Sequence, residues 1–154
     1  MLTHETYFRT YNLSVEQYGE ILATQAFPSG RKMASGNRGY DVKACIDGKE
    51  ARIEVKSKLS TTQTGKATVV HCGKHKFGAK GMTHLLVVLV DPSHPSSIDI
   101  AWLLTARQAK DLRRRRTKSQ YINVDDLRKA HGIEDVTKLL QRTANASLRL
   151  NPKA

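Results

Sequence analysis

Residues 40–58 read YDVKACIDGKEARIEVKSK and predict a β-hairpin. Apolar residues alternate with polar ones on both sides of Asp47-Gly48, and Asp-Gly is a preferred two-residue hairpin turn. This turn fixes the register, which pairs Ile46 with Lys49, Ala44 with Ala51 and Val42 with Ile53. The apolar pairs then fall on one face, as a strand that packs on a core requires.

The opposite face of this hairpin carries charges. The same register places Asp41 opposite Glu54, with Cβ atoms about 4.5–5.5 Å apart, and two carboxylates at that distance repel each other. A divalent cation between them would turn the repulsion into coordination, because hard cations bind carboxylate and carbonyl oxygens. Lys56 lies one pleat beyond Glu54 on the same face. The alternative is an edge strand with a solvated face, which a lone Glu-x-Lys pattern usually indicates.

The chain has 154 residues, which is enough for one compact domain with a core. It carries 26 Lys and Arg against 14 Asp and Glu, a formal net charge of +12. Such an excess predicts a polyanionic partner. Nucleic acid is favoured over a membrane, because the sequence has no basic amphipathic helix with an aromatic face. The alternative is a basic protein that is merely soluble.

The sequence gives no sign of export or membrane insertion. Its longest apolar run, 85–90, is too short to span a bilayer. Residues 1–14 contain no apolar segment typical of a signal peptide. Cys45 and Cys72 are too few for a disulfide framework, which favours a reducing compartment. We therefore predict a cytoplasmic, intracellular protein.

Helices and strands are predicted on both sides of the hairpin. Ser14 and Gln17 have the form of a capping box, which starts a helix over 15–27. The other expected elements are a basic glycine-rich loop over 31–39, strands over 67–72, 83–90 and 98–104 with a short helix or loop over 74–81, a helix from Thr105, and two short helices over 123–142 broken at Gly132. Residues 1–144 form the single predicted domain, and 145–154 a frayed tail. This pattern predicts an α/β or α+β fold with a mixed sheet flanked by helices.

The order of these features resembles the PD-(D/E)XK phosphodiesterase superfamily, which includes restriction endonucleases, Holliday junction resolvases and repair nucleases. The matching residues are Asp41 in GYDVKA and Glu54-Val55-Lys56 in RIEVKSK. Upstream, YGEILA is similar to the first helix of the family, whose acidic residue would be Glu20, with Glu16 as a competitor. Tyr40 stands where the motif's name has proline, a position that varies in the family. The resemblance covers residues 15–58 well and the following strands more loosely.

The resemblance implies a restriction endonuclease-like core of order α-β-β-β-α-β, with extra helices at the C-terminus. It implies that Asp41, Glu54 and the Val55 carbonyl bind Mg²⁺, for which Mn²⁺ would substitute. The metal would polarise a phosphate oxygen and acidify an attacking water. Lys56 would stabilise developing negative charge or position that water. Glu20 would tune this metal or help to bind a second one.

The implied activity is a magnesium-dependent endodeoxyribonuclease that acts on duplex or branched DNA, of restriction, resolvase or repair type. Two alternatives stay open: a non-catalytic nucleic-acid-binding protein on the same fold, and a nuclease of RNA. Many relatives are homodimers, and Val136, Leu139 and Leu140 would serve either an interface or the core. Trp102, on an apolar strand, is predicted to be core.

Basic side chains are the candidates for contact with nucleic acid, because Lys and Arg neutralise phosphates without reading sequence. These candidates are Arg31, Lys32, Arg38, Lys58, Lys74, Lys76, Arg113, Arg114, Arg115 and Arg116. The segment 113–116 would alternatively favour the helix macrodipole at a helix C-terminus. His71, Cys72 and His75 lie close together, but a closed zinc site needs four ligands, so phosphate contact is favoured over zinc.

Overall fold

The hairpin has the predicted register in the computed structural model of the chain, which describes residues 13–34, 39–62, 65–66, 68–73, 77–93, 97–114 and 120–150. Strands β2 (Val42–Ile46) and β3 (Lys49–Leu59) are antiparallel, and their pairs run from Ile46–Lys49 to Val42–Ile53. Asp47 and Gly48 form the turn with φ of +53° and +76°. Positive φ at both positions is what a type I′ hairpin turn requires.

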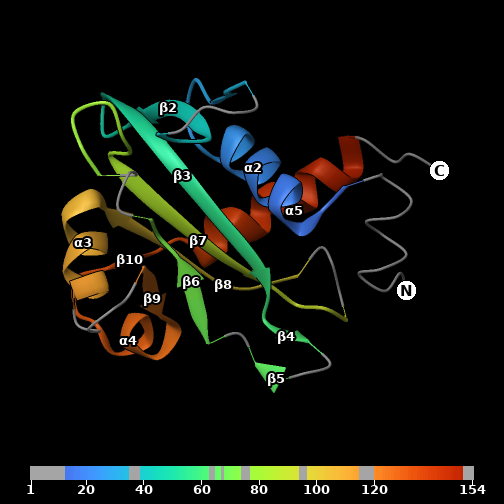
Figure 1. Ribbon diagram of the computed structural model, residues 1–154. Coiled ribbons are helices and arrows are strands. Elements are labelled where there is room, and N and C mark those ends of the chain that lie inside the picture. Colours follow the sequence, from blue (N-terminus) through green and yellow to red (C-terminus); the bar gives the residue numbers. More distant parts are fainter. Residues whose placement is uncertain are drawn as a thin grey trace.

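Strand β3 lies in the interior of a six-stranded mixed sheet of order β1-β2-β3-β7-β8-β10 (Figure 1). It runs parallel to β7 (His84–Val90), and β7 is antiparallel to β8 (Ile98–Thr105). The short strands β1 (Arg31–Lys32) and β10 (Glu134–Asp135) form the two edges. Beyond Ile53, β3 pairs with β7 alone, so the Glu-x-Lys segment does lie at a strand edge. The solvated face of that alternative is wrong, because Glu54 is buried, with 3% of its surface exposed.

Helices cover both faces of this sheet (Figure 1). On one face, α2 (Val15–Ala26) and α5 (Thr137–Leu150) pack over a core that includes Leu22, Val42, Ile53 and Leu140. The other face carries α3 (Ala106–Arg114), α4 (Val124–Lys129) and a separate ribbon of β6 (Val69–His71) and β9 (Tyr121–Asn123). A second core lies beneath them and includes Leu85, Trp102 and Ile122. A small hairpin, β4 (Thr61–Thr62) with β5 (Gly65–Lys66), extends beyond β3.

The structure confirms the two long apolar strands, the capping box at Ser14 and the helix that follows Thr105, where Thr105 and Gln108 form a second capping box. Trp102 and Leu140 lie in the core, as does Val136, with Leu139 packed against it.

Two predictions are corrected. The basic loop forms edge strand β1 at its start, and the last helix continues to Leu150, beyond residue 144, where a frayed tail was expected to begin. For 74–81 a short helix or a loop was predicted, and the described residues 77–81 form a loop. The described residues between β3 and β7 therefore lack the helix of the α-β-β-β-α-β order that the resemblance implies.

The described residues include no helix that is long and apolar enough to cross a membrane.

Helix α2 approaches β3 closely because Gly19 has no side chain. The Ser57 hydroxyl donates to the Val15 carbonyl oxygen at 2.6 Å, which ties the first turn of the helix to the strand. A Cβ at Gly19 would collide with the Ser57 hydroxyl and lie 2.6 Å from Ser57 Cβ. Only glycine fits this contact, and the contact fixes the acidic residues of α2 beside β3.

Gly19→Ala is therefore expected to destabilise the fold by about 1–3 kcal/mol, because overpacking forces the helix away from the strand. Ser57→Gly in the same chain should recover part of this loss, since it removes both colliding atoms and the two positions are in contact. Denaturant unfolding of the parent, both single variants and the double variant measures the coupling. Additive effects would contradict the close contact.

Candidate active site

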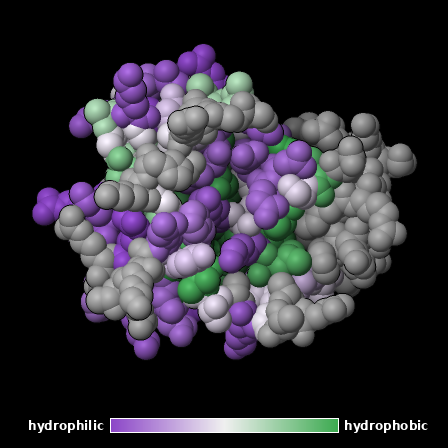
Figure 2. All heavy atoms as spheres, in the orientation of Figure 1, coloured by the Kyte–Doolittle hydropathy of each residue, from purple (hydrophilic) through white to green (hydrophobic). Residues whose placement is uncertain are grey.

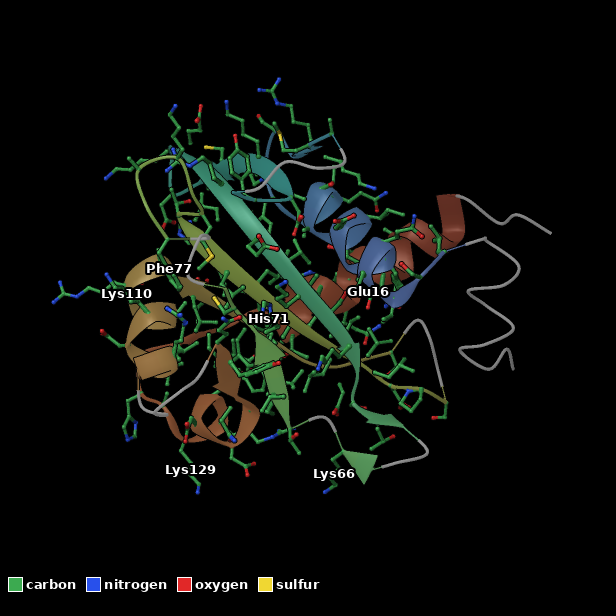
Figure 3. All side chains as sticks on the ribbon, in the orientation of Figure 1. Glu16, Lys66, His71, Phe77, Lys110 and Lys129 are labelled. Carbon is green, nitrogen blue, oxygen red and sulfur yellow. The ribbon has the colours of Figure 1, made fainter. Side chains whose placement is uncertain are left out.

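A cavity of about 300 Å³ lies along the edge of β3 that β2 leaves open. Pairing with β2 ends at Val42–Ile53, whereas pairing with β7 on the other side continues to Leu59. Three elements line the cavity around this edge. Glu16 and Glu20 come from α2, residues 54–58 from β3, Val70 and His71 from β6, and Asp41 from the segment that enters β2. Figure 3 shows Glu16 and His71 on either side of β3, and Figure 2 shows that this face of the molecule is largely hydrophilic.

The Asp41 side chain accepts a hydrogen bond from β3 that the backbone carbonyl of a neighbouring strand would otherwise accept. Its N–H donates to the Ile53 carbonyl oxygen at 2.9 Å, and its Oδ2 accepts the Val55 N–H at 2.9 Å. The prediction that Asp41 pairs directly opposite Glu54 is wrong, because the ladder between β2 and β3 ends at Val42–Ile53. Both carboxylates still line one cavity. The hydrogen bond from Val55 offsets part of the cost of holding them together.

The loop around Asp41 is held from several sides. The Asp41 carbonyl oxygen accepts the Met33 N–H at 2.8 Å. The Arg52 guanidinium lies 6.0 Å from the centre of the Tyr40 ring, and it donates to the Gly81 and Ala79 carbonyl oxygens at 2.6 and 3.2 Å. These contacts give Asp41 a fixed position, which a ligand of a metal or phosphate needs.

The Val55 carbonyl faces the same open side as Asp41. In a strand, the N–H and C=O of one residue point toward the same neighbour, and the Val55 N–H points to Asp41. The edge therefore presents the carboxylates of Asp41 and Glu54 and one carbonyl oxygen. These are the donors that hard divalent cations take, and magnesium keeps several waters besides its protein ligands. Within the described ranges, no three His, Cys, Asp or Glu residues group together as a metal site.

Glu54 and Lys56 form an ion pair inside the cavity. Lys56 Nζ lies 3.7 Å from Glu54 Oε1, and the side chain of Glu54 is 4% exposed while that of Lys56 is 27% exposed. A buried carboxylate is stable only with such partners. The open position of Lys56 leaves its ammonium accessible to an anion that enters the cavity.

Both acids of α2 reach the cavity, because residues four apart share one face of a helix. Glu20 Oε2 lies 3.3 Å from Lys32 Nζ. The preference for Glu20 over Glu16 stays a prediction. Lys32, which was expected to contact nucleic acid, is paired with Glu20 at the rim.

The β6 side of the cavity contributes His71. The sequence favoured phosphate contact over zinc for this histidine but did not assign it to the site. His71 Nε2 lies 3.2 Å from Gln120 Oε1, and the His71 and Tyr121 rings meet edge to face at 5.3 Å between centres. Lys58 Nζ donates to the Val69 carbonyl oxygen at 2.8 Å, which joins β3 to β6. Cys72 is buried in the second core, and neither it nor Cys45 is in a disulfide.

Two other basic candidates that the structure describes, Arg31 and Arg113, do not line the cavity. Arg31 is exposed on β1. Arg113, on α3, lies 5.6 Å from the centre of the Phe77 ring and does not line the cavity. The remaining candidates, Arg38, Lys74, Lys76, Arg115, Arg116 and the side chain of Arg114, lie outside the described residues. His75, which lies near His71 and Cys72 in the sequence, is also outside them.

Comparison with known proteins found no match, either among protein-family models or among curated proteins.

Replacing Asp41 tests the hydrogen bond to Val55. Asp41→Ala leaves the Val55 N–H without its acceptor and should lower the free energy of unfolding in EDTA by about 1–3 kcal/mol. Asp41→Asn keeps an acceptor oxygen and removes one of two neighbouring charges, so it should stay within about 1 kcal/mol of the parent. Denaturant melts of the three proteins compare these values. Equal losses in both variants would mean that the Asp41 charge, rather than its acceptor oxygen, stabilises the fold.

Proposed function

We propose that the protein is a divalent-metal-dependent endodeoxyribonuclease of the PD-(D/E)XK superfamily, with a restriction endonuclease-like core. The observation that carries the proposal is the hydrogen bond from the Val55 N–H to Asp41 Oδ2. It holds Asp41 beside Glu54 and Lys56 in one cavity at the open edge of an interior strand. The packing of α2 on β3 and the parallel pairing of β3 with β7 support the same fold.

The ligands in this proposal are Asp41, Glu54 and the Val55 carbonyl. A bound Mg²⁺ or Mn²⁺ supplies charge neutralisation at the phosphate and an activated water for hydrolysis. Glu16 and Glu20 add negative charge at the rim, which favours cation binding. With Lys32 paired to Glu20, this rim charge is partly neutralised.

Lys56 is the residue that acts on the substrate phosphate. Its ammonium is held near Glu54 and is partly exposed, so it can donate to a phosphate oxygen on which charge grows during the reaction. A fixed donor inside a cavity needs little rearrangement as the charge develops. Lys58 also lines the cavity, and its ammonium donates one hydrogen bond to the Val69 carbonyl oxygen, which leaves two donors for a phosphate.

The excess of basic residues supports a nucleic acid as the substrate. A formal charge of +12 attracts a polyanion and speeds its encounter with the protein. The cavity is at the lower end of the roughly 300–1,000 Å³ range of small-ligand sites. It therefore takes in a short piece of the backbone, while the rest of the substrate lies across the surface.

Lys56→Ala and Glu54→Gln are expected to lower magnesium-dependent cleavage by about 10²–10⁴-fold, because each removes a charged group at the reacting phosphate. Both variants should still bind DNA. Lys56→Ala leaves the buried Glu54 carboxylate without its ion-pair partner and should melt lower than the parent, so cleavage is compared below its melting temperature. The assay incubates supercoiled plasmid, linear duplex, single strand and a four-way junction with each protein, with Mg²⁺ and with EDTA.

Matched controls come from the same strand. Lys49→Ala and Glu50→Gln remove the same kinds of charge from exposed positions of β3 outside the cavity, where Glu50 pairs with Lys43 at 3.5 Å. They should cleave like the parent. Full cleavage by well-purified Lys56→Ala would refute the assignment of this site, and loss of cleavage in the controls would show that any charge change on β3 has the same effect.

A further inference from the structure

Two ion pairs involve acids of the cavity, and they differ in burial. Lys56 Nζ lies 3.7 Å from Glu54 Oε1, and the Glu54 side chain is 4% exposed. Lys32 Nζ lies 3.3 Å from Glu20 Oε2, with the two side chains 47% and 20% exposed. An ion pair that water reaches contributes little to stability, whereas a buried charge that loses its partner is costly. The pair between Lys32 and Glu20 is therefore the one that opens without disturbing the fold.

Both partners of this exposed pair start from positions that the fold holds. Lys32 pairs with Val42 in the ladder between β1 and β2. The next residue, Met33, donates its N–H to the Asp41 carbonyl oxygen at 2.8 Å. Glu20 lines the cavity from α2. Strand β1 is thus held beside Asp41 without the ion pair, and rotation of the two side chains is enough to separate them.

A divalent cation in the cavity competes with the Lys32 ammonium for the Glu20 carboxylate. Its proposed ligands are Asp41, Glu54 and the Val55 carbonyl, and Glu20 lines the same cavity. Opposite charges attract and like charges repel, more strongly where water is partly excluded. A cation with two charges therefore attracts Glu20 and repels Lys32, and both effects weaken the pair.

We infer that Lys32 is an exchangeable counter-ion, which neutralises Glu20 until a divalent cation enters the cavity and then binds a backbone phosphate of the substrate. This inference rests on the proposed function, because it assigns a role in metal and substrate binding at the same site. An ammonium released on an exposed edge strand is a phosphate contact that raises affinity without reading sequence. Binding of the metal and binding of the nucleic acid then favour each other, and the coupling is reciprocal.

The first test measures Mn²⁺ binding by isothermal titration calorimetry, without nucleic acid. Lys32→Met removes the ammonium and keeps an unbranched side chain, so this variant should bind Mn²⁺ about three- to tenfold more tightly than the parent. Added salt should shrink the difference, because it screens charges at the surface. Lys43→Met is the matched control. It removes a lysine that pairs with Glu50 at 3.5 Å outside the cavity, and it should bind Mn²⁺ like the parent.

Two results of this titration would overturn the inference. Equal Mn²⁺ affinity in the parent and in Lys32→Met would mean that the pair does not compete with the metal. A lower melting temperature of Lys32→Met together with that result would assign the pair a purely structural role between β1 and α2. An equal gain in Lys43→Met would mean that any loss of positive charge has the same effect.

The second test needs no metal. Glu20→Gln removes the charge that holds Lys32, so it should tighten the binding of a labelled DNA duplex in EDTA by about three- to tenfold. Lys32→Met alone should change this binding little, because in the parent the ammonium is engaged with Glu20. The double variant should lose the gain, since the two positions are in contact. Equal gains from Glu20→Gln with and without Lys32 would overturn the inference, because the lost negative charge alone would then explain them.

The outcomes separate this inference from the proposed function. Tighter Mn²⁺ binding in Lys32→Met, by a protein that cleaves none of the tested substrates, would keep the exchange and refute the nuclease. Cleavage that depends on Lys56, with Mn²⁺ affinity unchanged in Lys32→Met, would keep the nuclease and refute the exchange.

Discussion

The Val55 N–H donates to the side chain of Asp41 and not to the backbone of a neighbouring strand, which leaves this edge of β3 open. Residues of α2, β3 and β6 line one cavity at the open edge. If the residues before Val42 had also paired with β3 in this register, they would have closed the open edge beside Glu54 and Lys56. Instead, the chain turns away from β3 at Tyr40. There the Arg52 guanidinium contacts the Tyr40 ring and donates a hydrogen bond to the Gly81 carbonyl oxygen. The interruption of one ladder thus creates the site, and the carboxylate that interrupts it becomes part of the site.

The surrounding structure holds charges that a stable fold would otherwise avoid. Glu54 is buried on an interior strand and is balanced by Lys56. Helix α2 comes close enough to add two more acids only because Gly19 lacks a side chain. Each of these features costs stability or restricts the sequence, and none of them improves the core. Such local conflicts with folding are typical of functional sites.

The sequence alone predicted the parts of this arrangement that depend on local pattern. The Asp47-Gly48 turn and the alternation around it were enough for the hairpin register, and the apolar run of β7 was enough for a buried strand. The sequence alone could not predict which distant segments pair with each other. The position of β3 inside the sheet depends on contacts such as that from Arg52 to Thr83, 31 residues further along the chain. His71 reaches the cavity through a ribbon that joins it to Gln120, 49 residues away. The end of α5 was missed because the helix packs against α2 and β8, a long-range contact that its own sequence does not reveal.

Diffraction from crystals grown with Mn²⁺ tests the site most directly, because the anomalous signal locates the metal independently of any activity. We expect an anomalous peak in contact with the carboxylates of Asp41 and Glu54 and the Val55 carbonyl oxygen, at the roughly 2.0–2.2 Å typical of small hard cations. The peak should be absent from crystals of Asp41→Asn. A parent crystal without a peak at these three oxygens, or with an unchanged peak in Asp41→Asn, would contradict the proposal that this open edge is a metal-dependent phosphodiesterase site.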